Sequence, residues 1–278
     1  MIETKTKTKS DVTVYQVQFR NIAEFEKYLD ETQFNNVFSD KLSRVSVYGS
    51  EYFTGTKSYK QAVDMMHNGW EDKAKELDKK LKVVERDMTP MMKQQRVIGV
   101  AGYQPIVPLF LAGQPANMVS TVRRPVKQKV VTLVKSIAYP SRVSTSEWTE
   151  QGVKALAIVK DLERRGYRVN VDIVDGGYEG KTGFSCRVRV KSAAERLNVS
   201  KLAFLMCHPS SERRIFFRFQ EVFPHITKDF KYSYGKPFYR GDMEQMMDTS
   251  KEYLVPTFID DSFEKKMHDL KDLARYGK

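Results

Sequence analysis

The feature that most constrains the fold is a series of three patterned segments between residues 130 and 174. Residues 130–137 form a nearly continuous apolar run, which is typical of a central strand covered on both faces. Residues 144–165 place apolar side chains at helical intervals after a serine cap, and Gly166 follows as a stop signal. Residues 167–174 alternate as a second strand. This order predicts a right-handed βαβ unit with parallel strands.

Further elements are expected on both sides of this unit. We expect the first ten residues to form a frayed arm, and Ser58 to cap a helix that Gly69 interrupts and Glu71 resumes. Residues 45–53 are aromatic and β-branched, which predicts a strand. The other expected strands are 12–19, 97–103, 106–111, 184–190 and 253–259, and the other expected helices lie around Phe25 and at 198–207, 209–223 and 262–276.

These patterns together predict an α/β protein. A small N-terminal α/β lobe is expected at residues 1–95, followed by a Rossmann-like layered sheet with helices at residues 96–278. The boundary rests on the end of the helical pattern near Pro90 and on four prolines at 105, 108, 115 and 125. The same break also fits an internal loop of a single domain.

Composition excludes several classes of protein. Apolar residues make up 41% of the 278 residues and aromatic residues 12%, so the chain is not expected to be disordered. No apolar run is long enough to cross a bilayer, and the lysine-rich start lacks a signal-peptide core. Two cysteines cannot build a disulfide framework, and we expect both to be buried thiols. A cytoplasmic protein with no membrane partner is predicted.

Positive charge is concentrated in the middle of the chain. The formal net charge is +12. Residues 1–120 carry 17 basic and 15 acidic side chains, residues 121–240 carry 24 and 11, and residues 241–278 carry 6 and 9. A positive field on this scale attracts polyanions, so nucleic acid or an acidic protein is the expected partner class. The alternative is a basic surface that binds nothing.

Several basic segments in this region are candidates for contacts with nucleic acid. Arg187, Arg189 and Lys191 alternate along one expected strand and should share a face. Residues 230–240 interleave aromatic and cationic side chains, a composition that stacks unpaired bases, although the same rings would also pack a loop onto the core. The candidates are Arg123, Arg124, Lys127, Lys129, Arg187, Arg189, Lys191, Arg213, Arg214, Arg218, Lys231, Tyr232, Tyr234, Lys236, Tyr239 and Arg240.

One segment comes close to a phosphate-binding P-loop. Residues 175–182 read DGGYEGKT, whereas the motif needs glycine in place of Asp175 and a helix after the loop. A strand is expected there instead. A glycine-rich hairpin between two strands explains the same residues without a ligand.

The sequence contains no complete metal or cofactor motif. Cys207 and His208 would need two further ligands to hold zinc, and Cys186 and His225 are the available candidates. Three acidic residues near one strand end are candidates for magnesium: Asp172, Asp175 and Glu179. We expect neither site to form, and therefore no cofactor and no catalytic residues.

Five segments resemble an uncharacterised group of bacteriophage-encoded proteins. They span most of the chain, and the resemblance implies a phage product in the cytoplasm of a bacterial host, either free or associated with the virion. The segments are 51–56 with Ser58 and Tyr59, 67–70, 100–118, 162–169 and 213–218.

Residues 129–173 also resemble the opening of a von Willebrand factor A-type domain. Such domains carry a DxSxS metal-adhesion motif after the first strand, where this chain reads Lys135-Ser136-Ile137-Ala138-Tyr139. The aspartate is missing. The resemblance therefore implies a related fold without metal-dependent adhesion.

Three functions remain open at this point. The leading hypothesis is a non-enzymatic protein whose basic second half binds DNA or RNA. The first alternative is a protein-interaction module, either a virion component or an inhibitor of a host factor, that docks through the Rossmann-like domain. The second alternative is a metal-dependent nuclease that uses the acidic residues near 172–179.

Overall fold

The structure is a computed structural model. It describes residues 1–34, 45–75, 92–125, 129–140, 142–226, 234, 237–238 and 240–269. The chain forms two compact units. Unit 1 comprises Met1–Arg86 with Val130–Lys278, and unit 2 comprises Asp87–Lys129.

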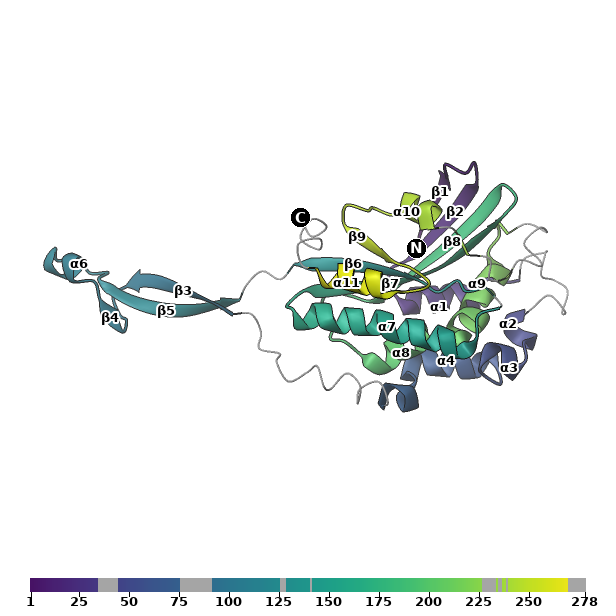
Figure 1. The fold of residues 1–278 in the computed structure, drawn as a ribbon, viewed down its shortest axis with the longest axis horizontal. Coiled ribbons are helices and arrows are strands. Elements are labelled where there is room, and N and C mark those ends of the chain that lie inside the picture. Colours follow the sequence, from purple (N-terminus) through teal and green to yellow (C-terminus); the bar gives the residue numbers. More distant parts are fainter. Residues whose placement is uncertain are drawn as a thin grey trace. The chain divides into compact units, whose positions relative to one another are not determined.

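Unit 1 is built on a six-stranded mixed sheet with the order β1-β2-β8-β7-β6-β9 (Figure 1). The β6/β7, β6/β9 and β2/β8 pairs are parallel, whereas β1/β2 and β7/β8 are antiparallel. The strands are β1 (Ile2–Lys7), β2 (Thr13–Phe19), β6 (Val130–Ser136), β7 (Arg168–Glu179), β8 (Thr182–Lys191) and β9 (Glu252–Val255). The parallel β6/β7 pair, joined by helix α7 (Thr145–Arg164), confirms the predicted βαβ unit.

Helices surround this sheet and largely begin where the sequence predicts. Ser144 caps α7 in a capping box with Glu147, and Ser58 caps α4. Gly166 follows the end of α7 with a positive φ of 86°. The remaining helices of unit 1 with assigned bounds are α1 (Ile22–Glu31), α2 (Val45–Tyr48), α3 (Glu51–Thr54), α4 (Tyr59–Asn68), α8 (Val199–Cys207), the π-helical η4 (Ser211–Phe216), α9 (Phe217–Val222), α10 (Arg240–Gln245) and α11 (Asp261–His268).

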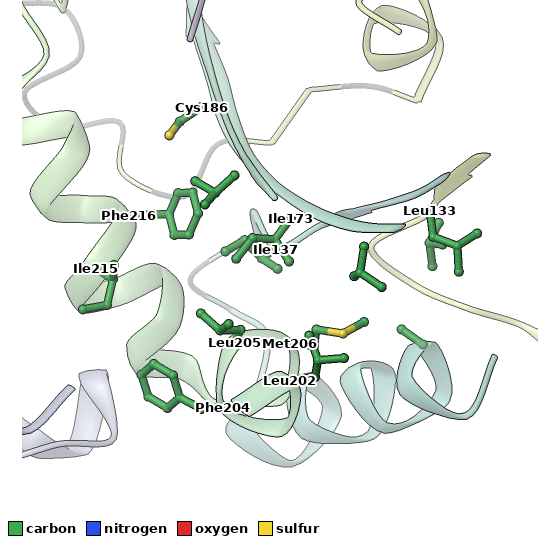
Figure 2. Packing of buried hydrophobic residues seen from close by; sticks show 14 of the residues in the cluster. Leu133, Ile137, Ile173, Cys186, Leu202, Phe204, Leu205, Met206, Ile215 and Phe216 are labelled. Atoms are coloured by element: carbon green, nitrogen blue, oxygen red, sulfur yellow. The ribbon is translucent and has the colours of Figure 1, made fainter. Parts of the chain in front are cut away.

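The main hydrophobic core lies between one face of the sheet and the helices. Figure 2 shows Ile137 and Ile173 on the sheet side, opposite Leu205 and Met206 of α8. Each large apolar side chain that is fully buried contributes about 1.5–3 kcal/mol to the free energy of unfolding. A smaller cluster, which includes Val134 and Met243 of α10, covers the other face. Side chains alternate between the two faces along each strand, and the two clusters together cover both faces of the sheet, as the apolar β6 run predicts.

The glycine-rich segment after β7 is a hairpin. Strand β7 continues to Glu179, Gly180 turns the chain with a φ of 57°, and β8 begins at Thr182. A Cβ atom on Gly176 would lie 2.7 Å from the carbonyl oxygen of Phe184, so this position has no room for a side chain. The structure confirms the hairpin interpretation of residues 175–182, since no helix follows them.

Two segments predicted as strands are helical. Residues 45–53 form α2 and α3, because Ser50 caps α3 at the amide of Phe53 and Gly55 ends it with a φ of 82°. Residues 106–111 form helix α6 (Val107–Leu111), which has Pro108 in its first turn. Both predictions were wrong because local capping and turn signals outweighed strand propensity.

The N-terminus is also more ordered than expected. Residues 1–10 were expected to be a frayed arm, but β1 pairs with β2 over six positions, from Ile2 opposite Gln18 to Lys7 opposite Thr13. The alternating lysines are typical of a sheet edge, where charge discourages pairing with other chains. Residues 71–75 are helical as predicted, and the rest of that predicted helix lies outside the described residues.

The two units differ from the division expected at residue 95. Strand β2 pairs in parallel with β8, so residues near the N-terminus share one sheet with the second half of the chain. Unit 2 contains an antiparallel sheet of order β3-β5-β4 and helix α6. Its strands are β3 (Met92–Gly99), β4 (Gln104–Pro105) and β5 (Met118–Pro125).

A buried carboxyl group connects α2 to α9. Glu221 accepts hydrogen bonds from the backbone amide of Ser46, at 2.9 Å, and from the Ser46 hydroxyl group. Tyr234 also donates its hydroxyl group to Glu221 at 3.3 Å. Burial raises the pKa of Glu221 to about 7, although the donors from Ser46 oppose this shift.

This pKa predicts a pH-dependent contribution to stability. Between pH ~4.5 and pH ~7 the native state keeps a proton on Glu221 that the unfolded state has lost, so rising pH lowers stability by up to ~1.4 kcal/mol per pH unit. Glu221→Gln removes this proton and preserves the contacts with Ser46. Urea unfolding at pH 5 and pH 7 should show a smaller loss of stability for the variant than for the wild type. Equal losses would contradict the assignment.

Candidate anion-binding pocket

A cavity of about 380 Å³ lies where β2 and β8 end. These neighbouring strands run in parallel, with Phe19 opposite Val188, so their carboxyl ends lie at one edge of the sheet. The chain continues from β2 into α1, and from β8 through residues 192–198 into α8. Crevices outside the carboxyl ends of strands are common ligand sites in α/β proteins.

Five cations and one carboxylate line this cavity. The cations are Arg20, Arg189, Lys191, Arg196 and Lys201, and the carboxylate is Glu195. The backbone amide of Ser192 donates to Glu195 at 2.8 Å. The lining is therefore strongly positive, which favours an anionic ligand.

Three of these cations already have partners within the protein. Arg189 binds Asp172 at 2.7 Å, and Arg20 binds Glu24 at 3.0 Å. Lys191 is buried, where it binds Glu163 and donates to the carbonyl oxygen of Val169 at 2.9 Å. These ion pairs position the lining of the cavity and reduce the charge available to a ligand.

The other two cations are available to a ligand. Arg196 and Lys201 are both exposed, and neither has an ion-pair partner among the residues that the structure describes. Lys201 lies in the first turn of α8, where the Asn198 side chain accepts from its backbone amide at 3.1 Å. The positive end of the α8 dipole adds to the charge of both side chains.

Strand β8 places its three predicted site residues on two faces of the sheet. Arg187 and Arg189 share a face as predicted, and both bind the fully buried Asp172. Lys191 lies on the other face. A register shift places Lys191 opposite Val171 while Arg189 is opposite Asp172. The expectation of one common face was wrong for Lys191. Arg187 also binds Glu252 of β9 at 2.6 Å.

The predicted arginines in the middle of η4 lie in the interior. Arg214 is fully buried and donates to the carbonyl oxygens of Ser46, at 2.7 Å, and of Gly49 and Thr56, both at 2.8 Å. Arg213 is buried and donates to the carbonyl oxygen of Phe53 at 2.7 Å. These side chains attach the α2–α3 segment to the core.

Arg218 is half-buried. Its guanidinium lies 3.8 Å from the ring centroid of Phe34 and donates to the carbonyl oxygens of Leu29 and Thr32. None of these contacts involves the residues that line the basic cavity. Arg213, Arg214 and Arg218 are therefore structural in the folded protein rather than parts of that pocket.

The remaining predicted residues are distributed elsewhere. Lys129 is exposed in unit 2, and Arg240 is exposed and bound to Glu244 at 2.8 Å. Tyr234 is half-buried with its ring centroid 4.6 Å from that of Phe217, as the packing alternative predicts for that residue. Strand β5 contains Arg123 and Arg124, whose side chains are outside the described part. Also outside it are Lys127, Lys231, Tyr232, Lys236 and Tyr239.

Three residues of the pocket were not predicted from the sequence. Arg20, Arg196 and Lys201 are separated by up to 181 positions, and no local motif connects them. The available signal was their position. Each lies within three residues of an asparagine helix cap, Asn21 or Asn198, that follows a strand.

The candidate metal ligands do not assemble. Among the described residues, no group of three or more histidine, cysteine, aspartate or glutamate side chains is placed to hold a metal ion. Cys186 and Cys207 are both buried free thiols, as predicted. The His208 Nδ1 atom accepts from the amide of Ser210 at 3.1 Å, and burial lowers the pKa of His208 to about 4.

Lys135 occupies the position of the missing adhesion aspartate. It is fully buried near the end of β6 and donates to the carbonyl oxygens of Pro256, at 2.6 Å, and Thr257, at 2.8 Å. Burial lowers the pKa of Lys135 to about 7. This position therefore carries an amine directed at carbonyl groups rather than a carboxylate that could bind a cation.

The fold and the cavity together define a mixed α/β protein with a basic pocket at the carboxyl ends of two parallel strands. Within the described ranges, no helix is both long and apolar enough to cross a membrane. The chain belongs to the family described as Domain of unknown function (DUF7192), whose model matches residues 3–273. Comparisons with curated proteins and with solved structures found no match.

Proposed function

We propose that the protein binds nucleic acid and holds a backbone phosphate in the basic pocket. The observation that carries this proposal is the pair of exposed cations, Arg196 and Lys201, beside a cavity with a positively charged lining. Lys and Arg contacts to phosphate supply most of the affinity of sequence-independent binding. The excess of basic residues at 121–240 supports the same partner.

The proposal does not distinguish DNA from RNA. Phosphate contacts position a protein on a nucleic acid without reading its sequence. The burial of Arg213 and Arg214 reduces the proposed interface to fewer residues than the sequence suggested. A phage origin, a cytoplasmic location and a non-enzymatic role stay predictions.

The test replaces the two exposed cations of the pocket. Arg196→Ala with Lys201→Ala should weaken binding to single- and double-stranded DNA and RNA by ~10-fold or more at ~50 mM salt. The slope of log K against log salt should fall in magnitude by about 2, one for each phosphate contact removed. Binding is measured by fluorescence anisotropy across a salt titration.

The matched control removes the same charge at a distance from the pocket. Lys57 and Lys60 are exposed near the start of α4. Gly55, two residues before Lys57, lies against His208 and Pro209, which follow the C-terminal end of α8, whereas the pocket lies at the N-terminal end of α8. Lys57→Ala with Lys60→Ala should change binding much less. An equal loss in both double variants would assign binding to net charge, and absence of wild-type binding at ~50 mM salt would exclude the proposal.

A further inference from the structure

Unit 2 exposes apolar side chains, and none of its described residues belongs to a hydrophobic core cluster. Across residues 95–122 no residue is buried, and helix α6 buries nothing. Phe110 is 63% exposed and Leu111 is 78% exposed. Other large exposed apolar residues of this unit are Ile98, Val100, Tyr103, Val107 and Val122. An exposed apolar surface of this kind marks an interaction site.

The apolar exposure covers both faces of the sheet. In the β3/β5 pairing Ile98 lies opposite Val119, and Gln95 lies opposite Val122. Because side chains alternate, Ile98 and Val122 lie on opposite faces, and they are 53% and 40% exposed. A partner that contacts only one face would leave the other in water. The partner therefore surrounds residues 97–122, which we call the tip of the unit.

Charge is separated along the unit. The 26 residues from Val97 to Val122 contain no charged side chain. Six cations and one acid, Asp87, lie on the two flanks, which gives unit 2 a formal charge of +5. The flanking cations are Lys93, Arg96, Arg123, Arg124, Lys127 and Lys129. An uncharged tip between cationic flanks is complementary to a surface that is apolar inside and anionic outside.

Both edges of this sheet discourage pairing with a second copy. Edge strand β3 contains Lys93 and Arg96, and edge strand β4 has only two residues, one of which is Pro105. Charge and proline on edge strands oppose strand addition. Two such units would also repel each other because each carries +5.

We propose that the tip of unit 2 inserts into the interface of an anionic lipid bilayer, with α6 among the acyl chains and the cationic flanks at the headgroups. This would be a peripheral contact and not a span. It would overturn the expectation, drawn from the sequence, that the protein has no membrane partner. It is independent of nucleic-acid binding at the pocket.

Vesicle flotation with the full-length protein tests the proposal. The wild type should float with phosphatidylcholine vesicles that contain about one-third phosphatidylglycerol, and much less with phosphatidylcholine alone. Phe110→Asp with Leu111→Asp should reduce this binding by ~10-fold or more. The control, Tyr52→Asp with Phe258→Asp, adds the same charge at exposed aromatic residues of unit 1 and should bind normally. Circular dichroism checks that each variant is folded.

A second measurement reports insertion directly. Phe110→Trp keeps the tip apolar, and its emission, after subtraction of the wild-type signal, should move to shorter wavelength with anionic vesicles. No wild-type binding at ~50 mM salt overturns the proposal. Binding that survives the Asp substitutions also overturns it and assigns the contact to surface charge. Light scattering tests for an oligomer that the Asp substitutions dissociate, in the absence of vesicle binding. That result would overturn the proposal and identify a second copy of the chain as the partner of unit 2.

Discussion

Replacement of Asp172 with asparagine should lower the free energy of unfolding by about 3–5 kcal/mol. The Asp172 side chain is fully buried and binds two cations, Arg187 through its Nε atom at 2.8 Å and Arg189 at 2.7 Å. Asparagine has nearly the same shape but no charge. The variant would therefore leave both guanidinium groups without their shared counterion. Among the described residues, Arg187 has a second counterion, Glu252, and Arg189 has none.

Urea unfolding at pH 7 measures this effect, with Asp11→Asn as the control. Asp11 forms exposed ion pairs with Lys7 and Lys181, and asparagine tolerates its positive φ of 61°. The control should unfold at nearly the wild-type urea concentration. A loss below ~1 kcal/mol in Asp172→Asn would show that the arginines find other partners.

The second large effect is expected at Arg214. Arg214→Met should cost about 3–5 kcal/mol, because it leaves the carbonyl oxygens of Ser46, Gly49 and Thr56 without their buried donor. Methionine fills much of the volume but donates no hydrogen bond. The loss should be concentrated in α2 and α3, since these carbonyl groups lie on that segment or next to it.

Hydrogen exchange separates this local effect from a global one. Amides of residues 45–56 should exchange faster in Arg214→Met than amides of β6 and β7, under conditions where the protein stays folded. Arg142→Met, at an exposed arginine, is the control and should leave both regions unchanged. Uniform acceleration throughout unit 1 would contradict a local role for Arg214.

Periodicity predicted the elements that pack through a repeated apolar face. The β6, α7 and β7 series, the Ser144 cap and the hairpin at Gly180 follow from local patterns that the tertiary structure reinforces. The same reasoning was wrong at residues 45–53. There the aromatic and β-branched residues form two short helices, stabilised by Arg214 and Glu221, which lie more than 150 positions away. Contacts at that separation leave no local periodicity.

The candidate site shows the same limit. The sequence indicated the excess of positive charge but not which cations remain available to a ligand. Arg187 and Arg214 bind groups inside the fold, whereas Arg196 and Lys201 lie exposed at the cavity. The availability of a cation depends on which acids and carbonyl groups the fold brings within about 4 Å of it.

The sequence by itself determined the α/β class, the parallel βαβ unit, the buried thiols and the basic middle of the chain. Only the tertiary structure decided that β2 joins the sheet beside β8, and this pairing brings Arg20 to the same cavity as Arg196 and Lys201. The physical reason is the distance along the chain over which each kind of interaction acts. Hydrophobic period and helix caps act over a few residues, whereas strand pairing and ion pairing depend on neighbours in space.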